Sequence, residues 1–152
     1  MAIVAVASSS KRLDAMRMML FWSLVLLFLA AQAYVRLAPS DPALWHVAPR
    51  ADSDKSFANG VVRRVPGVGQ AGFQRLDALI LATPRTVLLA GSPAEGMATY
   101  VSRTPIMGFP DYTTVITAGD DLLIYGRSRF GRRDLGVNAA RVEGWIRALT
   151  AG

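Results

Sequence analysis

The chain has 152 residues, 52% of them hydrophobic, and contains no cysteine. This length allows one domain of ordinary size, and the lack of cysteine excludes a disulfide framework, a zinc knuckle and a thiol nucleophile. The 17 basic residues outnumber the 11 acidic ones and give a net charge of +6. That surplus is well short of the charge of a nucleic-acid-binding protein.

An apolar stretch follows a short basic tail at the N-terminus. Residues 1–17 form the tail, and residues 18–35 carry no charge. As a helix, the second segment spans about 27 Å, enough for the hydrocarbon core of a bilayer. We therefore expect a transmembrane helix at 18–35. The alternative is a signal peptide that is cleaved between Ala33 and Tyr34.

The charges on either side of this segment predict its orientation. Lys11, Arg12 and Arg17 precede it, whereas Arg36 stands nearly alone after it. Because positive charge stays on the cytoplasmic side, the tail should lie in the cytoplasm and residues 36–152 outside it. We expect a single-pass protein of the cell inner membrane with a periplasmic C-terminal domain. Signal cleavage would leave the domain in the same compartment.

Residues 36–60 are rich in proline and predict an extended connector. Trp45 lies close enough to the apolar stretch to sit at the membrane interface; alternatively, it packs on the folded domain. His46 is the only histidine, and a flexible connector offers no rigid scaffold for it. We expect neither a catalytic nor a metal site there, and no cofactor.

Residues 61–152 show the periodicity of a folded domain. The pattern predicts five strands, at Val61–Val65, Thr86–Ala90, Met97–Arg103, Tyr112–Thr117 and Leu122–Phe130. It also predicts a helix at Gln70–Ala82 and a last helix capped by Asn138. The resulting fold class is α+β: a small two-layer domain with an antiparallel meander sheet and two helices, preceded by one N-terminal transmembrane helix.

The segment GVGQAG at 67–72 matches the glycine pattern of dinucleotide-binding turns. No acidic residue follows about 20 positions later to bind a ribose, and the chain is too short for a doubly wound fold. A turn into the helix is the better interpretation, so we expect no nucleotide partner.

The run YGRSRFGRRDLGVN at 125–138 holds the most suggestive residues. Strand alternation puts Tyr125, Arg127 and Arg129 on the face opposite the core, while Arg132 and Arg133 follow a glycine turn. One interpretation is structural: Asp111 or Asp134 pairs with some of these arginines and fixes the turn. The other is an anion site, in which guanidinium groups near a helix N-terminus bind a lipid headgroup or an acidic protein.

The segments SRTPIMGFPDYTTV and YGRSRFGRRDLGVNAARVEGWIRAL, with RLAPSDPALWH before them, resemble the family called domain of unknown function 1499. The resemblance covers residues 36–149. It implies a small α+β domain, often behind a membrane segment, with no established activity and no catalytic residues to transfer.

The sequence thus predicts a membrane-anchored binding or assembly module rather than an enzyme. Its partner would be a membrane lipid or a membrane protein complex, and no nucleic acid is expected. The binding residues would be Tyr125, Arg127, Arg129, Arg132 and Arg133. An alternative is a carrier of a small apolar ligand, in a cavity lined by Phe73, Ile124 and Trp145. An enzyme with a cleft between Asp111 and the arginines ranks third.

Overall fold

A computed structural model of the chain describes residues 2–49 and 51–151, and their side chains from Lys11 onward. The chain forms two units, residues 1–37 and residues 38–152. Each is described by itself.

The first unit is one long helix, α1 (Ala2–Leu37). It contains the predicted apolar stretch, so the predicted N-terminal helix is confirmed. Its part from Lys11 to Leu37 is 27 residues long and apolar enough to cross a membrane. None of the most apolar window of this segment is buried.

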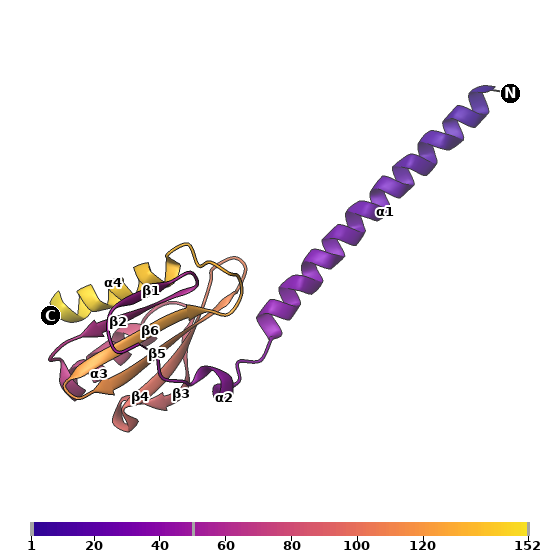
Figure 1. The fold of residues 1–152 in the computed structure, drawn as a ribbon. Helices are drawn as coiled ribbons and strands as arrows, with labels where there is room; N and C mark the ends of the chain where they lie inside the picture. Colours follow the sequence, from indigo (N-terminus) through magenta and orange to yellow (C-terminus); the bar gives the residue numbers. More distant parts are fainter. Residues whose placement is uncertain (1, 50, 152) are drawn as a thin grey trace. The chain divides into compact units, whose positions relative to one another are not determined.

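The second unit is a two-layer α+β domain, as the sequence predicted (Figure 1). Its antiparallel sheet has six strands in the order β1-β2-β6-β5-β4-β3. The strands are β1 (Lys55–Phe57), β2 (Gly60–Val65), β3 (Thr86–Ser92), β4 (Met97–Arg103), β5 (Pro110–Ala118) and β6 (Asp121–Ser128). The helices are α2 (Pro42–Trp45), α3 (Gly69–Leu81), the single-turn η1 (Pro93–Glu95) and α4 (Val137–Ala151).

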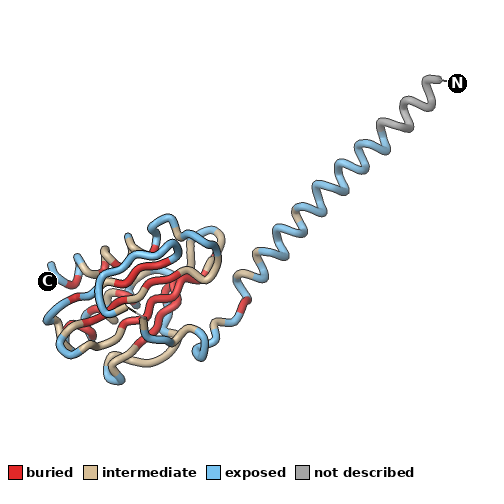
Figure 2. The backbone as a smooth tube through the Cα atoms, viewed as in Figure 1, coloured by how far each residue is buried: buried red, intermediate tan, exposed pale blue. Residues whose placement is uncertain are grey.

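Helices α3 and α4 cover one face of the sheet and enclose the core, drawn red in Figure 2. Strand alternation supplies the sheet side of this core: Leu122 and Ile124 of β6 face the helices. The helices contribute their apolar stripes. The fully buried core side chains include Val61, Phe73, Leu76, Ile80, Tyr100, Val115, Leu122, Ile124 and Val142.

The predicted connector is more structured than expected. Lys55–Phe57 pairs with Val62–Gly60 to add the edge strand β1, and a short helix, α2, begins at Pro42. The helix forms because Asp41 caps it, its carboxylate accepting the N–H of Ala43 at 2.9 Å, and because proline suits the first helical position. The second unit therefore begins at residue 38.

The last helix also differs in detail from the prediction. Asn138 lies inside α4 and is 1% exposed, so it is not the cap. Asp134 caps the helix instead. Its carboxylate accepts hydrogen bonds from the N–H of Gly136 at 2.9 Å and from the N–H of Asn138 at 3.2 Å. Glu143 of this helix pairs with Arg63 of β2 at 2.8 Å.

Candidate functional site

Residues 38–49, which we call the strap, pack on the sheet face that α3 and α4 leave uncovered. The Trp45 ring stacks on that of Tyr112, with centroids 3.9 Å apart and planes 10° from parallel. His46 Nδ1 lies 2.9 Å from the Thr99 hydroxyl, and the Ser40 hydroxyl lies 2.8 Å from that of Tyr112. Of the two alternatives for Trp45, the structure shows the one in which it packs on the domain.

Arg127 joins the strap to the middle of the sheet. Its Nη1 donates to the Thr114 hydroxyl at 3.2 Å, and its Nη2 donates to the carbonyl of Trp45. Its guanidinium carbon lies 4.5 Å from the Tyr125 ring centroid and 5.4 Å from that of Trp45. The predicted face is correct, but the strap covers it, so Arg127 is only 7% exposed.

Burial has an electrostatic consequence for Arg127. Desolvation lowers the pKa of its guanidinium below the ordinary value, and the neighbouring Tyr125 and Tyr112 oppose this shift. The ordinary pKa of arginine is so high that the group stays cationic. The sheet face under the strap therefore holds a fixed positive charge.

Arg129 joins the strap at its beginning. Its Nη1 donates to the Pro39 carbonyl at 2.8 Å and to the Tyr112 hydroxyl at 3.3 Å. Its guanidinium carbon lies 5.2 Å from the Phe130 ring centroid. Arg129 thus fixes the start of the strap to the C-terminal end of β6.

Arg132 and Arg133 have different surroundings from those of Arg127 and Arg129. Both are exposed, in the loop 129–136 between β6 and α4. In the same loop Leu135 is 91% exposed, and in the loop 104–109 Ile106 is 82% exposed. The rings of Phe109 and Phe130 join the two loops, with centroids 5.9 Å apart. We call Ile106, Arg132, Arg133 and Leu135 the loop patch.

The acidic residues expected beside the arginine run have structural partners elsewhere. Asp111 is 4% exposed and pairs with Arg141 of α4 at 3.1 Å, while accepting from the Ser128 hydroxyl at 2.7 Å. The Asn138 amide donates to the same hydroxyl at 2.9 Å. Asp111, Asp134 and Asn138 thus all bond within the domain, and the ion pair of Asp111 is with Arg141 of α4, not with an arginine of the run 125–138.

The glycine turn before α3 is held by the β5–β6 hairpin tip. The Gly67 N–H donates to the Asp121 carboxylate at 2.9 Å and the Gly69 N–H to the Asp120 carbonyl at 2.8 Å. Arg64 donates to the same carboxylate at 2.6 Å. The Gly67 bond, followed by the Arg64 bond, lowers the pKa of Asp121. These N–H groups already have acceptors, which agrees with a structural turn.

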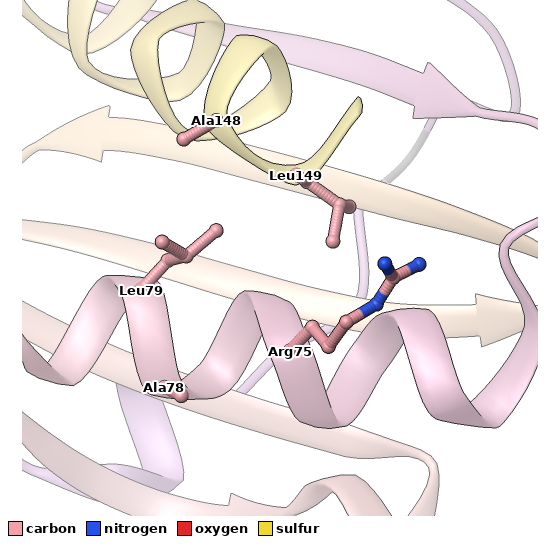
Figure 3. A pocket seen from close by; sticks show the side chains of 5 residues that line it. All are labelled: Arg75, Ala78, Leu79, Ala148 and Leu149. Carbon is pink, nitrogen blue, oxygen red and sulfur yellow. The ribbon is translucent and has the colours of Figure 1, made fainter. Parts of the chain in front are cut away.

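A hollow of about 410 Å³ lies between α3 and α4 (Figure 3). Leu79 and Leu149 point toward each other across it, and the Arg75 side chain extends along one end. Phe73, Ile124 and Trp145, expected to line a carrier cavity, are instead packed in the core. Trp145 also donates to the Thr83 hydroxyl at 2.8 Å.

One buried polar contact had no signal in the sequence. The Tyr100 hydroxyl of β4 donates to the Asp77 carboxylate of α3 at 2.6 Å. Burial first, and Asp77 second, raise the pKa of Tyr100. Within residues 11–49 and 51–151, no three His, Asp or Glu side chains gather in a way that could hold a metal ion.

A family model described as "Protein of unknown function (DUF1499)" matches residues 38–149. The chain belongs to the DUF1499 family. The match begins at the first strap residue, which agrees with the strap being part of the DUF1499 domain. No curated protein matches the chain.

Among solved structures, the DUF1499 chain is similar to a DUF4468 family protein from Bacteroides ovatus. The two share 15% sequence identity with a TM-score of 0.26, over 59% of this chain and 63% of that one. The chain thus spans less than two thirds of that protein.

Proposed function

We propose that this DUF1499 protein is a single-pass inner-membrane protein whose periplasmic domain binds anionic lipid headgroups through the loop patch. Arg132 and Arg133 supply the positive charge, and Ile106 and Leu135 supply apolar contact. The role is one of binding rather than catalysis, since the carboxylates of Asp111 and Asp121 are engaged in structural bonds.

The observation that carries the proposal is the hydrogen bond from Arg129 to the Pro39 carbonyl. Helix α1 ends at Leu37, and two residues of extended chain reach only about 7 Å. The bond therefore fixes Pro39, two residues after the last residue of α1 in the chain, to the C-terminal end of β6. The loop 129–136 begins at that same end of β6.

The composition of the loop patch supports a membrane surface as its target. Two exposed cations beside two exposed aliphatic side chains are typical of segments that lie in the lipid headgroup region. Each arginine near an anionic surface contributes about 1 kcal/mol. Leu135, 91% exposed, has a positive φ of 53°, a backbone conformation rare for leucine.

Hydrogen–deuterium exchange on the full chain in lipid nanodiscs tests the proposal. In discs that contain phosphatidylglycerol, the loop 129–136 should exchange more slowly than in discs of phosphatidylcholine alone. The double variant Arg132→Ser with Arg133→Ser should lose this difference.

The matched control is Arg75→Ser with Arg147→Ser, which removes the same charge from exposed sites on α3 and α4. It should behave like the parent chain. If the loop 129–136 of the parent chain exchanged equally fast in both kinds of disc, the proposal would be contradicted. If the loop double variant instead lost a co-purifying membrane protein in neutral lipid, the target would be a protein complex.

A further inference from the structure

A second concave site lies on the strap side of the sheet, apart from the loop patch. It is a cavity of about 330 Å³ lined by Val47, Ala48, Phe57, Val62, Tyr125 and Arg127. We call it the strap cavity. Its volume lies within the range of small-molecule sites, which are mostly apolar with a few placed polar groups. Among the described residues of the lining, Arg127 alone is charged.

Arg127 brings a charge to this cavity that no carboxylate of the described chain neutralises. The ion pairs among the described residues involve Arg17, Arg63, Arg64 and Arg141. The partners of Arg127 are a threonine hydroxyl, a backbone carbonyl and two aromatic rings, which are all neutral. Buried charges in proteins are normally paired, so this cation lacks its usual counterpart.

The guanidinium also has hydrogen-bonding capacity for a ligand. It carries five N–H donors in a planar fork, and two protein acceptors hold it, Thr114 Oγ1 and the Trp45 carbonyl. The same fork matches the two oxygens of a carboxylate. Around it, Val47 and Val62 offer aliphatic contact, and Phe57 and Tyr125 offer rings 6.4 Å apart.

We propose that the strap cavity binds a small organic monoanion, a carboxylate with an apolar body. The carboxylate neutralises Arg127, and the body lies among Val47, Phe57, Val62 and Tyr125. The ligand also touches the strap at Ala48, so its binding stabilises the closed strap. This site is independent of the loop patch, and either can fail without the other.

Fluorine NMR of 4-fluorobenzoate tests the proposal, with the full chain in nanodiscs of phosphatidylcholine and empty discs as background. The neutral analogue 4-fluorobenzamide has nearly the same shape. The acid should bind saturably, and the amide at least about tenfold more weakly, because it lacks the charge-assisted bond. Equal binding of acid and amide, or no saturable binding of the acid, would overturn the proposal.

A matched pair of variants locates the binding. Ala48→Phe fills the cavity and leaves Arg127 in place, whereas Ala43→Phe makes the same change at an exposed strap position outside the cavity. Ala48→Phe should weaken acid binding at least about tenfold, and Ala43→Phe should leave it unchanged. Near-ultraviolet circular dichroism confirms that both variants fold. Unchanged binding in Ala48→Phe would place the acid elsewhere and overturn the site.

Discussion

Trp45 of the strap stacks on Tyr112 of β5 at a centroid distance of 3.9 Å. The contact joins the segment that follows α1 to the centre of the sheet. Tyr112 is fully buried, because the strap covers it on the sheet face opposite the helices. The loop patch and the strap cavity both depend on this arrangement, because the strap fixes the end of β6 and closes one side of the cavity.

Removing the stacked ring should destabilise the domain. Trp45→Ala is expected to lower the free energy of unfolding by about 2 kcal/mol, since it removes a half-buried aromatic pair. Urea unfolding of the full chain in detergent micelles, followed by near-ultraviolet circular dichroism, measures this. Leu44→Ala, at an adjacent residue that is 68% exposed, should change stability by less than about 0.5 kcal/mol. Similar effects of the two variants would refute the packing role.

Arg127 should control the closure of the strap. Arg127→Ala removes the donor to the Trp45 carbonyl, and a lost buried hydrogen bond costs about 1–3 kcal/mol. We expect amide exchange in residues 43–48 to become at least about tenfold faster. Exchange in α3 and α4 should stay the same. Uniform acceleration across the domain would mean that Arg127 supports the whole fold instead of the strap.

The ion pair between Asp111 and Arg141 should contribute more to stability than the more exposed pair between Glu143 and Arg63. Asp111→Asn leaves Arg141, whose side chain is 17% exposed, without its ionic partner and should cost about 3 kcal/mol of unfolding free energy. Glu143→Gln breaks the pair with Arg63, in which the Glu143 side chain is 45% exposed; it should cost less than about 1 kcal/mol. Denaturant unfolding of both variants gives the comparison. The reverse order would contradict the assigned pairing.

Asp121 should make stability depend on pH in the acidic range. Its pKa is lower in the folded chain than its ordinary value of 3.8, so its stabilising contribution is present above pH 4 or so and is lost as the pH falls through the folded pKa. The unfolding midpoint of Asp121→Asn should therefore lie below that of the parent at about pH 6 and approach it near pH 2. If the difference between the two unfolding midpoints did not change with pH, the charge of the Asp121 carboxylate would not contribute to stability.

Local pattern in the sequence accounts for much of the fold. Alternation placed Leu122 and Ile124 in the core and Tyr125 and Arg127 on the opposite face, because strand geometry fixes side-chain direction. The same alternation could not show that the strap, which precedes the strands in the chain, covers that face. The stacking of Trp45 on Tyr112 is a contact between distant parts of the chain, which no local pattern encodes.

Some of the missed features did have a signal. Asp41 followed by Pro42 is the signature of a helix start, and it marks α2 inside the supposed connector. Asp134 four residues before Asn138 offered a second capping candidate for α4. Arg141 gave no such signal, since its partner Asp111 lies on a different element. The sequence therefore pointed to the arginines of the candidate site, but not to which of them remain exposed, nor to Ile106 and Leu135.

Spin labelling tests the central claim most directly, because the chain contains no cysteine. A spin label on Leu135→Cys would report on the surroundings of the loop patch. A label on Ala94→Cys would report on an exposed turn elsewhere in the domain. In nanodiscs with phosphatidylglycerol, the Leu135 label should gain oxygen accessibility and lose accessibility to a water-soluble nickel complex, while the Ala94 label keeps water-like values. Water-like values for both labels in anionic and neutral discs alike would contradict membrane binding by the loop patch.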